Sequence, residues 1–260
     1  MALTSFLTNI ADKLRSYLGG DKITARSFAD KIDDVFEVGA KSEYDSFWDE
    51  YQRPLLNPLT ECQQLFSGRG WNDKNFRPKN DIVATGNASS MFLMNAVTDL
   101  KGILEDCGVV LDTSQATSTQ MLFMSSTWLT ALPEINASNS TSIGHMFSYC
   151  SNLKTVDKFV FGEKNLTGGS VPSFTGTSPF ISCSALEHII FDGTLACNGI
   201  DLHWSTKLDK ESLLSLISVL KDYSADTSET KWVCTIGTEN LAKLTDGEKA
   251  VATQKGWTLA

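Results

Sequence analysis

A degenerate block of eight residues occurs four times in the middle of the chain, and it constrains the fold more than any other feature. The copies read LMNAVTDL, LFMSSTWL, MFSYCSNL and PFISCSAL, and they end on Leu100, Leu129, Leu153 and Leu186. Three places later comes a second apolar residue: Ile103, Leu132, Val156 or Ile189. The closing leucines lie 29, 24 and 33 residues apart, an irregular period within the range of solenoid proteins. Because solenoid units bury their faces only against neighbours, we expect function on an extended surface.

The third and fourth copies share a phenylalanine, a cysteine and a leucine at matching places. These residues are Phe147, Cys150 and Leu153 in one copy, and Phe180, Cys183 and Leu186 in the other. The pattern resembles the BspA-type leucine-rich repeat, in which a phenylalanine and a C-x-x-L phrase precede a short strand. The first two copies have Val97 and Ser126 at the cysteine place. The resemblance implies an α+β fold: an irregular leucine-rich-repeat solenoid over residues 65–205, with the four closing leucines in one interior row.

The two ends of the chain carry long phrases with no catalytic pattern. They are SFLTNIADKLRSYLGGDKITARSFADKIDDVF, AKSEYDSFWDEYQ and, at the C-terminus, TENLAKLTDGEKAVATQKGWTLA. These phrases resemble the flanks of repeat-bearing structural proteins of tailed bacteriophages and prophages. The resemblance implies a virion component of the tail fibre, tail tip or baseplate, made in the host cytoplasm and released by lysis. Its expected partners are other virion structural proteins, further copies of this chain, and a glycan or protein of the host surface.

Net charge and hydropathy exclude two kinds of partner. The formal charge of −9 argues against nucleic acid, whose readers need a basic stripe. Residues 30–61 hold nine acidic and three basic side chains, which is typical of a solvated helical face. No stretch approaches the roughly 18 apolar residues that cross a bilayer, and residues 1–14 lack the apolar run of a signal peptide. We therefore expect no membrane insertion and no export by the usual route.

Residues 1–64 are expected to form a helical attachment or oligomerisation region. Apolar residues recur at helical spacing over 3–18, and Gly19-Gly20 ends that run. A cluster of aromatic residues follows near residue 47. The candidates for attachment or oligomerisation are Phe6, Ile10, Leu14, Phe47 and Trp48. Two interpretations stay open for the aromatic cluster: it caps the first repeat, or it docks the protein on a partner.

Residues 206–260 are expected to form a C-terminal α/β cap. A helical stripe comes first, formed by Leu213, Leu216, Ile217 and Leu220. Residues 231–237 then have the pattern of a strand, and Thr245-x-x-Glu248 is a capping box for a helix that ends at Gly256. A cap of this kind covers the open end of a solenoid, which otherwise exposes its core.

The cysteines and histidines do not predict a metal or a cofactor. The six cysteines contain no C-x-x-C pair, and the three histidines lack the spacing of metal ligands. Cys150 and Cys183 occupy the same place in two repeats, where we expect buried free thiols. A disulfide between adjacent repeats stays open, because spacing alone does not exclude it.

The main enzymatic alternative is a polysaccharide depolymerase, whose chemistry needs two opposed carboxylates. Of the acidic residues between 99 and 192 only Glu105 and Asp106 are neighbours, and adjacent side chains do not face each other on a helix or a strand. We therefore expect a non-enzymatic protein that contacts the host envelope. A bacterial surface adhesin or a structural spacer is the remaining alternative.

The residues after each closing leucine predict a ligand-contact surface. In successive copies they are Lys101, Thr130, Lys154 and Glu187, followed by Gly102, Ala131, Thr155 and His188. Strand residues at equivalent places form a column across neighbouring units. The ligand-contact candidates are Thr130, Lys154, Thr155, Glu187 and His188. The alternative is an ordinary solvated sheet face, and Trp128 and Tyr149 are interpreted as bulky repeat fillers rather than as platforms for sugars.

Overall fold

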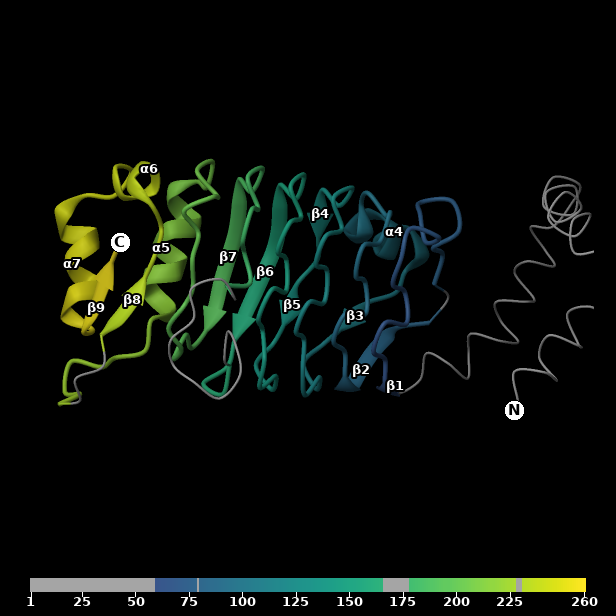
Figure 1. Cartoon of the computed structure of the whole chain (residues 1–260), viewed down its shortest axis with the longest axis horizontal. Helices are drawn as coiled ribbons and strands as arrows, with labels where there is room; N and C mark the ends of the chain where they lie inside the picture. Colours follow the sequence, from purple (N-terminus) through teal and green to yellow (C-terminus); the bar gives the residue numbers. More distant parts are fainter. Residues whose placement is uncertain (1–58, 79, 166–177, 228–230) are drawn as a thin grey trace, which may run out of the picture. The chain divides into compact units, whose positions relative to one another are not determined.

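The computed structural model describes residues 59–260 apart from 79, 166–177 and 228–230 (Figure 1). The chain separates into two compact units, Met1–Gln52 and Arg53–Ala260, and the described residues belong to the second. The attachment candidates Phe6, Ile10, Leu14, Phe47 and Trp48 lie outside the described residues. The division of the chain at residues 64 and 205 stays a prediction.

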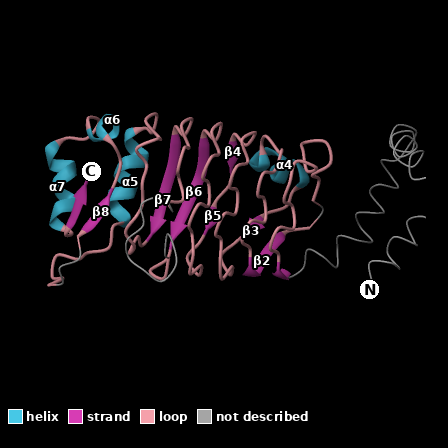
Figure 2. Ribbon diagram, in the orientation of Figure 1, coloured by secondary structure: helices cyan, strands magenta, loops and turns pink. Residues whose placement is uncertain are grey.

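The described part mixes short helices with small parallel sheets, which confirms the α+β class (Figure 2). The helices are α4 (Leu100–Cys107), α5 (Lys210–Val219), α6 (Thr238–Leu241) and α7 (Asp246–Gln254). The strands are β1 (Leu59–Glu61), β2 (Ile82–Asn87), β3 (Leu111–Asp112), β4 (Ala131–Leu132), β5 (Ile135–Asn136), β6 (Thr155–Phe161), β7 (His188–Gly193), β8 (Trp232–Cys234) and β9 (Trp257–Leu259). Within the described part, no helix is long and apolar enough to cross a bilayer.

Four five-residue segments of similar backbone follow one another through the described part, and we call them the stacked turns: 64–68, 90–94, 121–125 and 145–149. The first and last residue of each turn has a positive φ, in most cases at a non-glycine residue. The central phenylalanine N–H of each turn donates to a carbonyl of the next segment, at 2.8 Å in all four cases. These bonds satisfy backbone groups that would otherwise be unpaired in the interior.

A ladder of phenylalanine rings fills the space behind the stacked turns. Its members are Phe66, Phe92, Phe123, Phe147 and Phe180, and consecutive ring centroids are 5.2, 5.2, 5.8 and 5.2 Å apart. All five rings are buried, so each covers its neighbour as in a close-packed core. Phe159 on β6 meets Phe147 edge-on at 5.5 Å, which places the strands and the stacked turns on opposite sides of this core.

The strands β4, β6 and β7 lie side by side in parallel (Figure 1). Their register aligns Leu132 with Val156 and Val156 with Ile189, and all three side chains are fully buried. Parallel strands are joined by long crossover connections, and stacked turns lie within these connections. Leu129, Leu153 and Leu186, which precede these strands, are also buried.

The prediction that Leu100 shares a row with Leu129 is wrong. The Thr130 N–H donates to the Thr98 carbonyl at 2.7 Å, so Val97 is the residue in register with Leu129. A bridge between Asp99 and Ala131 then aligns Leu100, the first residue of α4, with Leu132. The first copy is one residue shorter between its phenylalanine and its closing apolar residue, and that residue is a valine. The cysteine place in this copy is accordingly occupied by Asn95 and not by Val97.

The C-terminal segment confirms the predicted stripe and capping box. Leu213, Leu216 and Ile217 are buried on α5, which packs against β7. At the start of α7 the Thr245 side chain accepts from the Glu248 N–H, and the Glu248 side chain accepts from the Thr245 N–H. Gly256 has φ +82° and leads into β9, which pairs in parallel with β8.

The interpretation of Trp128 and Tyr149 as interior fillers is wrong, because their side chains are 54% and 45% exposed. The phenylalanine ladder already fills the interior at this level. Tyr149 has a positive φ at the end of a stacked turn, which directs its side chain away from the core. Both residues therefore belong to the surface.

Candidate functional site

The predicted ligand-contact residues are brought together by a continuous backbone ladder, and we call this surface the polar column. The Lys154 N–H donates to the Thr130 carbonyl at 2.8 Å, and the Glu187 N–H donates to the Lys154 carbonyl at 2.8 Å. The next position on each strand pairs Thr155 with His188. The five residues Thr130, Lys154, Thr155, Glu187 and His188 are thus neighbours on adjacent segments.

The polar column extends one step beyond the predicted residues at each end. Thr98 occupies the place predicted for Lys101, since the Thr130 N–H and hydroxyl both donate to the Thr98 carbonyl at 2.7 Å. At the other end the Asp209 N–H donates to the Glu187 carbonyl at 2.8 Å. Asp209 was not among the predicted residues, although Asp209-x-x-Ser212 before an apolar stripe is an N-cap pattern.

His188 and Asp209 form a side-chain contact at one end of the column. The His188 Nδ1 lies 2.6 Å from the Asp209 Oδ2, while the Asp209 Oδ1 accepts from the Ser212 N–H and hydroxyl at 2.8 and 2.7 Å. Burial tends to raise the pKa of Asp209, but these hydrogen bonds outweigh it and hold the pKa below its ordinary value. Asp209 therefore stays ionised near neutral pH, where it caps α5 and orients the imidazole.

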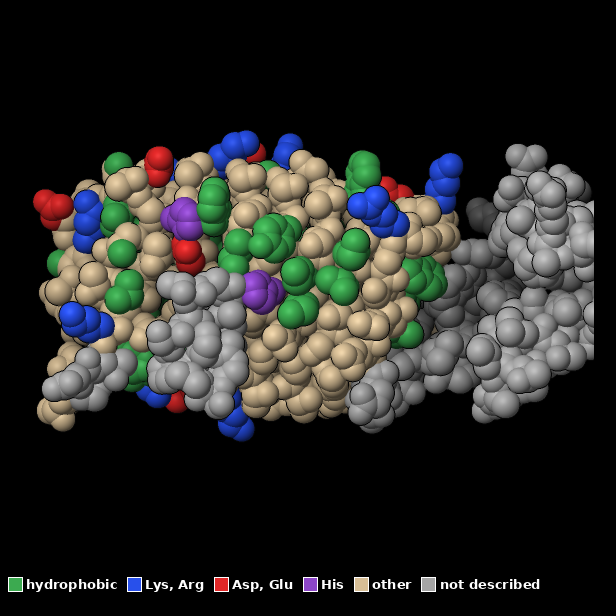
Figure 3. All heavy atoms as spheres, viewed as in Figure 1, with side chains coloured by type: hydrophobic (Ala, Val, Ile, Leu, Met, Phe, Trp, Pro, Cys, Tyr) green, Lys and Arg blue, Asp and Glu red, His purple; other side chains and the backbone are tan. Residues whose placement is uncertain are grey.

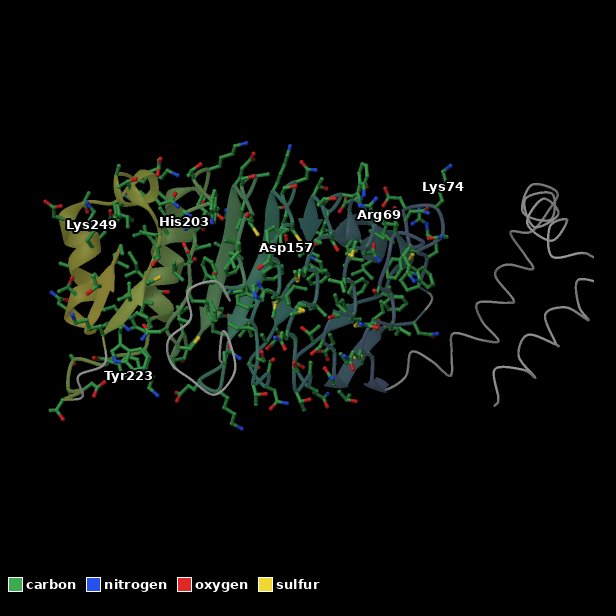
Figure 4. The ribbon with its side chains drawn as sticks, in the orientation of Figure 1. Arg69, Lys74, Asp157, His203, Tyr223 and Lys249 are labelled. Atoms are coloured by element: carbon green, nitrogen blue, oxygen red, sulfur yellow. The ribbon has the colours of Figure 1, made fainter. Side chains whose placement is uncertain are left out.

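Lys154 and Glu187 are exposed and available to a partner. Among the described residues, neither side chain has a hydrogen-bonded or ion-paired partner. The lysines nearby on the strand side have partners. The Lys101 Nζ donates a hydrogen bond to Asp157 at 2.8 Å (Figure 4), and the Lys158 Nζ lies 3.3 Å from the Glu134 carboxylate. The hydrogen bond from Lys101 to Asp157 raises the pKa of that lysine. An exposed pair of opposite charges can orient a polar partner without the attraction for phosphate of a basic patch.

The histidines do not form a hydrolytic triad in the described part of the chain. The His145 Nδ1 lies 3.3 Å from the Ser148 Oγ, but Ser148 is fully buried and its hydroxyl donates to the Ser178 carbonyl. A substrate cannot reach a nucleophile in that position. Burial lowers the pKa of His145, which favours its neutral form. The His203 Nδ1 lies 2.5 Å from the Asp201 Oδ1, and the same carboxylate oxygen accepts from the His203 N–H.

The expectation of buried free thiols is confirmed for Cys150 and Cys183, which are free and fully buried. Burial raises the pKa of Cys150 to about 12 and the pKa of Cys183 well above its ordinary value. Across the ranges that the structure describes, there is no group of three or more His, Cys, Asp or Glu side chains that could hold a metal ion. The polar column itself presents groups that can recognise a ligand by hydrogen bonds and charge.

Comparisons with known proteins gave no assignment: no family model, no curated protein and no solved structure matches this chain.

Proposed function

We propose that this chain is a non-enzymatic component of a tailed-bacteriophage virion, located in the tail fibre, tail tip or baseplate, and that its polar column contacts the host cell envelope. The proposal includes its architecture: an irregular leucine-rich-repeat solenoid of the BspA type, closed by a C-terminal α/β cap. The stacked turns, the phenylalanine ladder and the parallel strands support this architecture, since each segment packs against the next.

The observation that carries the function is the exposure of Lys154 and Glu187 on adjacent steps of an ordered ladder. Their backbones are fixed by the hydrogen bonds that link Thr130 to Glu187, so little backbone conformational entropy is lost when a partner binds. A shallow surface of this kind binds weakly in one copy. Several copies on one particle can strengthen attachment by roughly 10²–10⁴ through effective concentration alone.

The test uses the full chain, either monomeric or multimerised on streptavidin, with cells of a bacterial panel that includes the strain carrying the gene. We expect retention on cells only for the multimer, and weaker retention for the charge swap Lys154→Glu with Glu187→Lys. A matched control swaps charges on the C-terminal helices α6 and α7, Lys249→Glu with Glu239→Lys, and leaves the net charge unchanged. Equal retention of both swapped proteins contradicts the assignment of the polar column.

Two further measurements separate the alternatives. Mass spectrometry of phage particles induced from the carrier strain should detect the chain, and its absence from purified particles while it is present on the cell surface would favour an adhesin. Release of reducing sugar from purified envelope polysaccharide would favour a depolymerase. Neither result depends on the charge swap.

A further inference from the structure

A second surface lies on the opposite side of the core from the strands, and we call it the turn strip. In each segment it contains the residue just before a buried asparagine, serine or cysteine. These residues are Met94, Ser125, Tyr149, Ser182 and Trp204. Backbone bonds link neighbouring steps, since the Met94 N–H donates to the Met124 carbonyl at 2.9 Å and the Tyr149 N–H to the Ile181 carbonyl at 2.7 Å. Trp204 is level with Ser182, because the bond from the Asp209 N–H to the Glu187 carbonyl offsets these two segments by 209 − 187 = 22 residues.

Large and small side chains alternate along the turn strip. Met94, Tyr149 and Trp204 are 45%, 45% and 48% exposed, whereas the serines between them leave open steps. Adjacent steps of a sheet-like stack are about 4.8 Å apart, so every second step advances roughly 10 Å. Figure 3 shows hydrophobic and histidine side chains on one face of the molecule. The strip therefore offers apolar platforms at a spacing of about one disaccharide.

The alternation of apolar and hydroxyl steps along the turn strip disfavours a protein partner. Protein interfaces have a contiguous apolar core surrounded by a polar rim, and here hydroxyl groups interrupt the apolar groups at every second step. A pyranose ring suits the arrangement better, because one of its faces presents C–H groups while its edge presents hydroxyls. An exposed tyrosine or tryptophan likewise combines an apolar ring with a polar group. The His203 ring lies 4.5 Å from the Trp204 ring and is held by Asp201, so hydrogen-bonding groups lie beside this platform.

The charge of the turn strip selects among polysaccharides. The segments 90–94, 121–125, 145–149, 178–182 and 200–204 contain no lysine or arginine, and Asp201 is their only carboxylate. An anionic polymer finds no counter-charge there. A neutral chain meets no such barrier.

We propose that the turn strip binds a neutral, unbranched polysaccharide, with sugar rings stacked on Tyr149 and Trp204 and one unoccupied serine step between them. The serine step at Ser182 gives the chain room to pass between the two platforms. This site is separate from the polar column, so the two proposals can fail independently.

The test measures binding of soluble hexasaccharides to the full chain by calorimetry and tryptophan fluorescence. The probes are β-1,4-linked hexamers of N-acetylglucosamine and of glucose, an α-1,4-linked glucose hexamer, and an anionic galacturonate hexamer. We expect saturable binding of at least one neutral probe and none of the anionic probe. Tyr149→Ala and Trp204→Ala should each weaken binding about threefold to tenfold, as expected for the loss of one aromatic contact.

Trp128→Ala is the matched control, since it removes an equally exposed tryptophan outside the turn strip. It should leave affinity unchanged, and all three variants should keep the parental melting temperature. Absence of saturable binding to every neutral probe overturns the proposal, as does tighter binding of the galacturonate hexamer. Equal loss in Trp128→Ala and Trp204→Ala overturns the location. The charge swap at Lys154 and Glu187 should not change hexasaccharide affinity.

Discussion

The Cys150 thiol donates a hydrogen bond to the Phe123 carbonyl in the preceding segment, 3.0 Å away. Cys183 makes the same contact with the Phe147 carbonyl at 3.1 Å, and Ser126 makes it with the Phe92 carbonyl at 2.7 Å. Asn95 in the first copy makes the same contact with the Phe66 carbonyl at 2.8 Å, so the position requires a side chain that can donate a hydrogen bond. Cysteine and serine both meet that requirement within this one chain.

We therefore predict that Cys150→Ser is tolerated better than Cys150→Ala. The serine hydroxyl keeps the bond to Phe123, whereas alanine loses about 0.5–1.5 kcal/mol of hydrogen bonding and leaves a small cavity. Urea denaturation followed by circular dichroism measures both variants. Equal destabilisation of the two would show that the thiol acts only as an apolar filler.

The interior position of Leu153 gives a second prediction. Leu153→Ala should lower the free energy of unfolding by about 2–5 kcal/mol, because the side chain is fully buried beside Leu129 and Leu186. The control is Leu214→Ala on α5, where the leucine is 38% exposed. That change should stay within about 0.5 kcal/mol of the parent. Similar losses in both variants would contradict the burial of Leu153.

The sequence predicted those parts of the fold that depend on local chemistry. The α5 stripe follows from helical periodicity, and the Thr245–Glu248 box follows from a pairing of two side chains with two backbone donors within one turn. The register of the first copy could not be obtained in this way. The first copy is one residue shorter before Val97, and only the backbone hydrogen bonds to the next segment reveal this. The sequence alignment therefore matched Leu100, instead of Val97, with the closing leucines of the other copies.

The candidate site was predictable in its strand residues and not in its partners. Equivalent places after the closing leucine gave Thr130, Lys154 and Glu187, since a parallel ladder keeps such places in register. Asp209 was missed because its role depends on where α5 begins in space. The exposure of Tyr149 was missed because bulk alone does not reveal whether a side chain faces the core.

We expect substitution by alanine to have opposite effects on stability at two glycines. Gly193 has φ +78°, and a Cβ there would lie 2.1 Å from the Phe161 carbonyl oxygen. Gly193→Ala should therefore destabilise the protein by more than about 1 kcal/mol. Gly247 lies in α7 with open space around a Cβ, so Gly247→Ala should stabilise by up to about 1 kcal/mol. Thermal melts of both variants check the two signs.

We expect the charged Glu248 side chain to contribute to stability, and we expect this contribution to disappear in acid. Hydrogen bonds from the Thr245 N–H and an ion pair with Lys210 at 2.9 Å lower its pKa from 4.5 to about 2. Because the folded pKa lies below the unfolded one, the contribution is complete above pH 4.5 and is lost as the pH falls toward 2. Glu248→Gln keeps a capping amide but loses the charge. Its deficit in urea midpoint at pH 7 should shrink as the pH is lowered through this window, and a constant deficit would contradict the assignment.

The thiols predict a reactivity pattern that also tests for a disulfide. Cys62, Cys150, Cys183, Cys197 and Cys234 are buried, whereas Cys107 is partly exposed. Burial raises the pKa of Cys150, Cys197 and Cys234 to about 12, which leaves almost no thiolate at pH 8. In the native protein a thiol reagent should therefore modify Cys107 first, and Cys107→Ser should remove that fast phase.

Urea without reductant should then expose all six thiols, because every cysteine is free. A count of four, with Cys150 and Cys183 missing from the labelled peptides, would instead reveal a disulfide between adjacent segments. Such a bond would require both side chains to leave the carbonyls of Phe123 and Phe147 that they now contact. It would also remove the hydrogen-bond donors of Cys150 and Cys183, which are equivalent to the Ser126 hydroxyl. We therefore expect six.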